Sequence, residues 1–260
     1  MLATRCYGLV EKPTLLLLHG FLGDKDDWQA LMPRLSQRFY CICMDLPGHG
    51  DSPALPLPSP GFEQVAQQIQ SSLSDLGVER FHLLGYSLGG RIALHLLPLM
   101  GEAILSITLE SCHPGLASDA LRRERLTQDN QWNERLQQVS IEAFLDLWYQ
   151  QGVFADLSDK QRQQLIARRR YNKIQGLSAI YLPTSLGQQQ ELIHLPNQYP
   201  IAWHYLVGKD DTKFSALAAK WQTQAPIQLH YFDNAGHNVH LAQGEAFCHT
   251  LEAILLKDPL

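Results

Sequence analysis

The segment at residues 85–89, Gly-Tyr-Ser-Leu-Gly, is the strongest chemical signal in the sequence. Its two glycines allow close backbone approach, so Ser87 can occupy a strained turn from which its hydroxyl projects. An apolar run at 81–84 precedes the motif and a helical stretch at 88–97 follows it. A serine in this setting is activated when a histidine takes its proton and a carboxylate orients that histidine. We therefore expect Ser87 to be the catalytic serine.

Short apolar runs alternate with helical stretches on both sides of this motif. The expected strands lie at 14–18, 39–44, 81–84, 104–109, 202–207 and 227–232, and the expected helices at 28–37, 62–76, 88–97, 213–222 and 244–256. Continuous apolar runs are typical of parallel strands that are buried on both faces. The pattern predicts an α/β fold with a mostly parallel sheet, helices on both faces, and a binding site at the carboxyl edge of the strands.

The alternation stops between residues 115 and 196. This stretch is polar and helical, and two proline-bearing loops at 113–115 and 195–197 bracket it. We expect a core formed by residues 1–114 and 197–260, with 115–196 inserted as a helical cap over the strand edge. Together with the serine motif, this organisation predicts an α/β-hydrolase fold.

In that fold the catalytic residues follow the order serine, acid, histidine along the chain. His237 follows the predicted strand at 227–232, which places it on a loop at the catalytic edge; His240 is the weaker alternative. The acid is expected just after the strand at 202–207, where Asp210 and Asp211 are adjacent. The fold's pattern favours Asp211, whose role would be to orient His237. Asp210 remains an open alternative.

Two backbone N–H groups could stabilise negative charge on a substrate oxygen. The N–H of Leu88 opens the helix that follows Ser87. The N–H of Phe21 lies in the His-Gly-Phe loop at 19–21, which follows the predicted strand at 14–18. We expect these two donors to form an oxyanion hole.

Composition argues against several other classes of function. The formal net charge of -5 is unlike that of a typical nucleic-acid-binding protein. The five cysteines have no metal-ligand spacing, and no apolar stretch approaches the roughly 20 residues of a membrane span. No phosphate-binding glycine loop follows a strand. We therefore expect no metal, cofactor, nucleic acid or membrane insertion, a cytoplasmic location, and a monomer or weak homo-oligomer.

Three further segments narrow the family. The first combines residues 113–116 with the arginines of 122–125. The second is 148–154, and the third combines 211–214 with 235–238. Together with the general motifs, they closely resemble the 2-succinyl-6-hydroxy-2,4-cyclohexadiene-1-carboxylate synthase family of menaquinone biosynthesis, over residues 15 to 255. The resemblance implies a lyase that eliminates pyruvate from 2-succinyl-5-enolpyruvyl-6-hydroxy-3-cyclohexene-1-carboxylate. Ser87, His237 and Asp211 would then serve proton abstraction next to a ketone.

The substrate implied by the resemblance is a small tricarboxylate, and the predicted cap carries eight arginines. Guanidinium groups bind carboxylates through paired hydrogen bonds. By similarity, Arg125 and Arg169 would bind carboxylates, while Tyr86, Arg91 and Trp148 would line the pocket. Arg168 and Arg170 are alternatives to Arg169, because one sequence does not fix the register of three consecutive arginines.

Two other functions compete with this interpretation. A carboxylesterase or thioesterase would use the same serine, acid and histidine, although the arginine-rich cap is unlike the apolar cap of a typical esterase. A non-enzymatic binding protein on the same scaffold is disfavoured, because Ser87, Asp211 and His237 are all in place.

Overall fold

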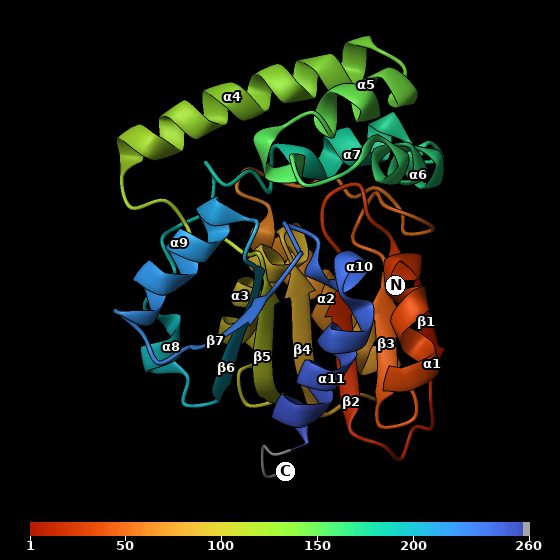
Figure 1. Cartoon of the computed structure of the whole chain (residues 1–260), viewed down its shortest axis with the longest axis vertical. Helices are drawn as coiled ribbons and strands as arrows, with labels where there is room; N and C mark the ends of the chain where they lie inside the picture. Colours follow the sequence, from red (N-terminus) through yellow and green to blue (C-terminus); the bar gives the residue numbers. More distant parts are fainter. Residues whose placement is uncertain (257–260) are drawn as a thin grey trace.

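The structure is a computed structural model in which residues 1–256 are described. Its centre is a seven-stranded sheet with the order β1-β3-β2-β4-β5-β6-β7 (Figure 1). The strands are β1 (Thr4–Tyr7), β2 (Thr14–Leu18), β3 (Tyr40–Met44), β4 (Phe81–Tyr86), β5 (Ile104–Glu110), β6 (Ala202–Gly208) and β7 (Gln228–Phe232). All neighbouring strands are parallel except β1, which pairs antiparallel with β3. The predicted mostly parallel sheet is confirmed.

The sequence reading missed β1. This strand has four residues, and two of them, Arg5 and Cys6, are exposed. It pairs only with β3 at the edge of the sheet, in a register that sets Thr4 opposite Met44. An edge strand needs no continuous apolar run, because only part of its surface is covered. The buried strands were recognised from such runs; Leu15 to Leu18 in β2, for example, are fully buried.

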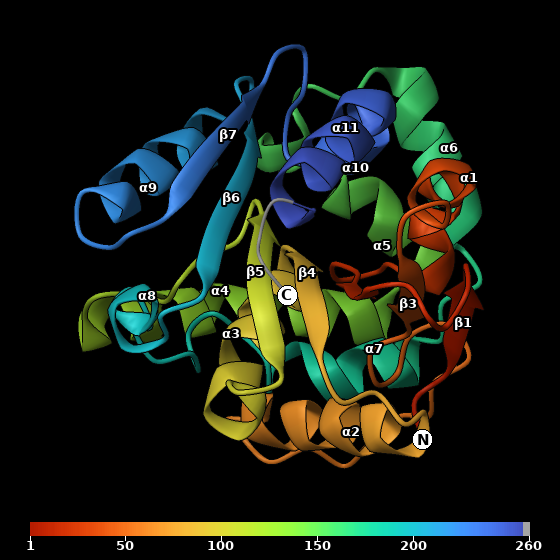
Figure 2. The ribbon, with the colours of Figure 1, turned by 90° about the horizontal axis from the view of Figure 1, so that it is seen from below.

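Helices cover both faces of the sheet (Figure 2). These helices are α1 (Met32–Leu35), α2 (Phe62–Asp75), α3 (Leu88–Met100), α9 (Thr212–Gln222), α10 (Val239–Ala242) and α11 (Gly244–Leu255). The side chains of α2, α3 and α9 join one apolar cluster with the sheet, and those of α1 and α11 join a second cluster on the other face. The predicted layers are therefore present.

The helix expected at 28–37 is wrong. In its place, a 3-10 helix η1 runs over Lys25–Leu31 and is followed by the single turn of α1. The Asp24 side chain accepts a hydrogen bond from the Asp26 N–H, and the side chain of Asp27 completes a capping box. This cap starts the helical segment several residues earlier than apolar spacing alone indicated.

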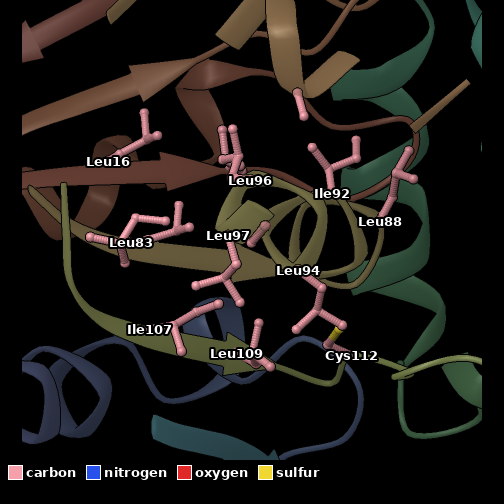
Figure 3. Close-up of a cluster of buried hydrophobic side chains, with 14 of the residues drawn as sticks. Leu16, Leu83, Leu88, Ile92, Leu94, Leu96, Leu97, Ile107, Leu109 and Cys112 are labelled. Carbon is pink, nitrogen blue, oxygen red and sulfur yellow. The ribbon is translucent and has the colours of Figure 1, made fainter. Parts of the chain in front are cut away.

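The helix after Ser87 packs closely against the sheet. Figure 3 shows Leu88 and Ile92 of α3 in the same cluster of buried side chains as Leu83 of β4 and Ile107 of β5. A side chain at Gly90 would place its Cβ 2.7 Å from the Cβ of Cys112, so this approach requires glycine. The packing fixes the position of the helix start relative to the carboxyl edge of the strands.

A layer of helices lies over that edge, between β5 and β6 in the chain (Figure 1). It contains α4 (Asp119–Gln138), α5 (Ile141–Trp148), η2 (Gly152–Phe154), α6 (Asp159–Arg169) and α7 (Ile174–Tyr181), and α8 (Leu195–Gln198) leads back into the core. Side chains of α4 to α7 form a third apolar cluster, which includes Leu136, Phe144 and Leu177 and also Leu22 from the loop after β2. The exact cap boundaries at residues 115 and 196 stay a prediction.

Candidate active site

Ser87 lies at the sharp turn between β4 and α3. Its φ of 51° is in the left-handed region, which is unusual for a residue other than glycine. The Ser87 N–H donates to the carbonyl oxygen of Glu110 at 2.9 Å and ties the turn to β5. A Cβ at Gly89 would lie 2.2 Å from the carbonyl oxygen of Leu18, and one at Gly85 would lie 2.6 Å from that of Gly89. Both flanking glycines are therefore required by close backbone approach.

His237 joins Ser87 to Asp211. His237 Nδ1 lies 2.7 Å from Asp211 Oδ2, and His237 Nε2 lies 3.4 Å from Ser87 Oγ. The other Asp211 oxygen accepts the Phe214 N–H at 3.0 Å. The side chains of Asp211 and His237 are almost completely buried. The structure thus brings together the three residues selected from the sequence.

The two alternative residues lie elsewhere. Asp210 is exposed, and its backbone N–H donates to the carbonyl oxygen of Ala235. His240 is buried behind Tyr86, and its Nδ1 lies 2.8 Å from both carboxylate oxygens of Glu110. His240 is therefore paired with Glu110 and not with Asp211.

The backbone N–H groups of Phe21 and Leu88 are available for a substrate oxygen. Within residues 1–256, neither of them donates a hydrogen bond to a protein acceptor. The turn after Phe21 is fixed by Leu22, whose φ is 69° and whose N–H donates to His49 Nε2 at 3.2 Å. Leu88 is the first residue of α3, where a helical N–H has no partner in its own helix.

A cavity of about 230 Å³ lies between the sheet edge and the helices above it. Ser87 and His237 reach it from below, while Trp148 and Arg125 belong to the helical layer. The complete lining is Ser87, Arg125, Gln128, Asp129, Trp132, Trp148, Gln151, Val153, Phe154, Tyr181, Lys213, Phe214 and His237. The cavity therefore combines a serine–histidine pair with aromatic rings and positive charge.

Arg125 is held in place by a buried carboxylate. Its Nε lies 2.9 Å from both oxygens of Asp129, one turn further along α4. Asp129 also accepts hydrogen bonds from the hydroxyls of Tyr181, at 3.0 Å, and Ser185, at 2.6 Å. These contacts use Nε, so the two terminal nitrogens of the Arg125 guanidinium stay available at the cavity.

Tyr86 and Arg91 do not line this cavity. The Tyr86 hydroxyl donates to Asn238 Oδ1, and burial raises the pKa of its phenol well above the usual value. Arg91 donates to the carbonyl oxygen of Thr184. Burial, together with the nearby charge of Arg125, lowers the pKa of Arg91 to about 10.

Arg169 also lies outside the cavity, in a buried ion pair. Its terminal nitrogens lie 2.6 and 2.7 Å from the two carboxylate oxygens of Asp27 in η1. Burial alone would lower the pKa of the Arg169 guanidinium, but the charge of Asp27 raises it above its usual value. Arg168 is half exposed and Arg170 contacts Tyr171 on the surface. In this structure Arg169 thus joins α6 to the core, and its contact with a substrate carboxylate stays a prediction.

Several residues at the site were missed from the sequence. Asp129 holds Arg125, Asn238 holds Tyr86, and Phe214 packs against the His237 ring with a centroid distance of 4.7 Å. The only sequence signal for Asp129 was its spacing of four residues from Arg125, which is common for ion pairs on helices. Lys213 also reaches the cavity, two residues after Asp211.

No group of three or more His, Cys, Asp or Glu residues within residues 1–256 could hold a metal ion. No helix in the same range is long and apolar enough to cross a membrane. A larger depression of about 780 Å³ lies near the start of β5, beside Tyr199 and Arg80, and its lining contains no serine–histidine pair.

Comparison with known proteins agrees with this architecture. A family model described as the alpha/beta hydrolase fold matches residues 13–242. The chain is 38% identical to a 2-succinyl-6-hydroxy-2,4-cyclohexadiene-1-carboxylate synthase of Pectobacterium atrosepticum, over 94% of each chain. It is also 38% identical to the synthase of the same name from Serratia proteamaculans, over 98% of this chain and 99% of that one.

Solved structures share the fold at lower sequence identity. The structure of MenH from S. aureus superposes with a TM-score of 0.92 at 24% identity and covers 99% of both chains. A thermophilic esterase from Thermogutta terrifontis gives a TM-score of 0.82 at 20% identity, over 98% of this chain and 93% of that one. From the geometry and the two curated relatives together, the chain belongs to the α/β-hydrolase fold family and, within it, to the 2-succinyl-6-hydroxy-2,4-cyclohexadiene-1-carboxylate synthase family.

Proposed function

We propose that this protein is a lyase that eliminates pyruvate from 2-succinyl-5-enolpyruvyl-6-hydroxy-3-cyclohexene-1-carboxylate. The product would be 2-succinyl-6-hydroxy-2,4-cyclohexadiene-1-carboxylate, an intermediate of menaquinone biosynthesis. The observation that carries the proposal is the 38% identity to synthases of that name over nearly the whole chain, including the helices above the active-site edge. We propose that the reaction proceeds without a metal or cofactor.

In this proposal Ser87, His237 and Asp211 act as one base. His237 Nε2 faces Ser87 Oγ at 3.4 Å, while Asp211 holds Nδ1 and fixes the ring orientation. A proton leaves the ring carbon next to the succinyl ketone and is taken up by this base. Its electron pair forms a double bond to the adjacent ring carbon C3, the existing C3=C4 double bond shifts to C4=C5, and the bond from C5 to the enolpyruvyl oxygen breaks. The released enolpyruvate then gains a proton on carbon and becomes pyruvate.

Negative charge develops on the ketone oxygen during proton removal. The free N–H groups of Phe21 and Leu88 are the donors that we propose for this oxygen. Donors fixed in place before the reaction stabilise such charge strongly, because they need no reorganisation at the moment of reaction. The same donors that serve a tetrahedral intermediate in an esterase thus serve an enolate here.

The substrate is a tricarboxylate, and the cavity offers positive charge to match it. We propose Arg125 as a carboxylate ligand, since Asp129 orients it through Nε and leaves its terminal nitrogens free. Trp148, which contacts the Phe21 ring at a centroid distance of 5.2 Å, would form an aromatic wall. Tyr86 and Arg91 would support the site from behind. Arg169 could reach a carboxylate only after its pair with Asp27 opens.

The substrate is small and multiply charged, which suits an enzyme of the cytoplasm. We propose that location, and a monomer or weak homo-oligomer that has no nucleic-acid partner. Size-exclusion chromatography with light scattering at low micromolar protein would test the oligomeric state.

One comparison of substrates tests the lyase against a carboxylesterase or thioesterase. Purified protein is given the enolpyruvyl substrate, with pyruvate measured by a coupled assay, and separately given simple aryl esters and acyl thioesters. We expect pyruvate release with EDTA present, and slow or absent ester cleavage. Rapid ester or thioester hydrolysis without pyruvate formation would replace the lyase by a hydrolase.

The choice of acid is tested by a matched pair of variants. Asp211→Asn removes the charge that faces His237, whereas Asp210→Asn changes an exposed neighbour. We expect Asp211→Asn to lower kcat by at least about 10-fold, since loss of the orienting carboxylate favours the wrong histidine tautomer. A larger loss in Asp210→Asn than in Asp211→Asn would show that the acid was assigned to the wrong residue.

A further inference from the structure

We propose that Lys213 is a further substrate-binding residue, whose ammonium group forms a carboxylate subsite together with Arg125 at the mouth of the cavity. The inference rests on the proposed lyase function and adds a specificity-determining residue to it. Lys213 lines the same cavity as Ser87, His237 and Arg125. It belongs to the core and Arg125 belongs to the helical layer, so the subsite would span the two parts.

The position of Lys213 follows from the position of the acid. Asp211 caps the N-terminus of α9 by accepting the Phe214 N–H, and Lys213 lies in the first turn of this helix. Its Nζ lies 5.7 Å from the centre of the Phe214 ring, and that ring packs against His237. The residue that orients His237 therefore also fixes where the Lys213 ammonium can reach.

The two cations of this cavity, Arg125 and Lys213, differ in how they are held. Within residues 1–256, no carboxylate forms an ion pair with Lys213. Asp129 is already engaged by Arg125, Tyr181 and a serine hydroxyl. Asp211 is engaged by His237 and by a backbone N–H. Both carboxylates already accept hydrogen bonds from other groups, and Asp211 acts on Lys213 only through its charge.

Lys213 is exposed to solvent and lies near other cations. Partial desolvation and then the charge of Arg125 lower the pKa of Lys213 below its usual value, while the charge of Asp211 acts in the opposite direction. Burial and then Arg91 lower the pKa of His113 to about 3, with Lys213 and Arg125 adding to the effect. These cations repel one another in the unliganded protein. An anion bound between Lys213 and Arg125 would relieve that repulsion.

The ligand class follows from this arrangement. A carboxylate has two oxygens, so one can accept from the Arg125 guanidinium while the other faces the Lys213 ammonium. An uncharged ester would gain nothing from either group and would leave two cations partly desolvated. Lys213 would thus favour the anionic substrate over the neutral esters that other members of this fold hydrolyse.

The test uses Lys213→Met, which keeps the length of the side chain and removes its charge. Lys220→Met is the matched control, because Lys220 lies on the same helix and is exposed like Lys213 but does not line the cavity. For pyruvate release, we expect Lys213→Met to raise KM about 10-fold, with kcat changed less than about 2-fold. Lys213→Arg should recover most of the loss, and the KM of Lys213→Met should depend less on ionic strength.

The outcomes separate the subsite from other roles. If Lys213 only held Phe214 against His237, Lys213→Met would lower kcat and leave KM and its salt dependence unchanged, which would overturn the proposal. Should the wild-type protein release no pyruvate, the proposed reaction itself fails. Binding of tricarballylate, measured by calorimetry, then decides the subsite. Weaker binding to Lys213→Met than to Lys220→Met supports the proposal, and equal affinities refute it.

Discussion

Replacing Asp27 with alanine would remove the main partner of the buried Arg169 guanidinium and leave only the carboxylate of Asp24, at 3.9 Å. The side chains of this pair are only 2% and 6% exposed. Its two contacts, at 2.6 and 2.7 Å, join η1 of the core to the end of α6 above the active-site edge. The pair therefore connects the two parts of the molecule at one point.

The expected cost follows from this burial. Removing one partner of a buried ion pair costs about 3–5 kcal/mol, because a desolvated charge is left uncompensated. In a domain of this size each kcal/mol lowers Tm by about 2–4 °C, so Asp27→Ala should lower Tm by roughly 6–20 °C. The neighbouring Asp26→Ala breaks an exposed pair with Arg5, whose side chain is 43% exposed. Exposed pairs contribute about 0.2–1 kcal/mol, so Asp26→Ala should behave almost like wild type.

Urea unfolding, followed by circular dichroism, measures both variants. The double variant Asp27→Leu with Arg169→Met removes both charges and should recover most of the stability, since an apolar pair of similar volume needs no compensation. If the free energies of unfolding of Asp27→Ala and Asp26→Ala differ by less than about 1 kcal/mol, the assignment of a buried ion pair is refuted. A double variant that is less stable than Asp27→Ala would refute it too.

Three further predictions concern the site and its supports. Arg125→Ala should lower kcat/KM for pyruvate release by about 10- to 200-fold, because charge-assisted hydrogen bonds to the substrate are lost. Arg123 is exposed on the same helix, so Arg123→Ala should have no effect. Equal activities of the two variants would show that Arg125 does not bind the substrate. Gly89→Ala should lower both Tm and activity, because its Cβ would lie 2.2 Å from the Leu18 carbonyl oxygen; a variant with normal Tm and turnover would contradict the required close approach. Burial, with the charge of Arg91, lowers the pKa of His95 to about 4. The unfolded chain therefore binds this proton first, and His95 should make the protein less stable as pH drops from about 6.5 to about 4, by up to about 1.4 kcal/mol per pH unit. His95→Gln should reduce this slope in urea titrations without abolishing it, since His113 and His204 also have lowered pKa values, and an unchanged slope would count against the buried neutral histidine.

The features that were predicted from the sequence have local causes. The position of Ser87 is determined by an apolar run, two glycines and a helix start, all within about a dozen residues. The buried strands could be recognised because a parallel strand that is covered on both faces needs apolar side chains at nearly every position. His237 and Asp211 were found from their positions just after two such strands, and the structure brings both next to Ser87.

The features that were missed depend on contacts between distant segments. Asp27 and Arg169 are 142 residues apart, and no local sequence pattern predicts their ion pair. The register of the three arginines is likewise set by packing, since only Arg169 points inward at the end of α6 while Arg168 and Arg170 face solvent. The edge strand β1 and the capped 3-10 helix lacked the apolar periodicity on which the expectations relied.

The most direct test of the account is the activity of Ser87→Ala with the enolpyruvyl substrate. The Ser87 hydroxyl faces the cavity and His237, so its removal should leave the fold, and therefore the circular dichroism spectrum, unchanged. The account predicts that wild type releases one pyruvate per substrate consumed, and that Ser87→Ala loses on the order of 10³-fold or more in kcat/KM. Near-normal pyruvate release by a folded Ser87→Ala would contradict the central claim that this serine acts in the elimination.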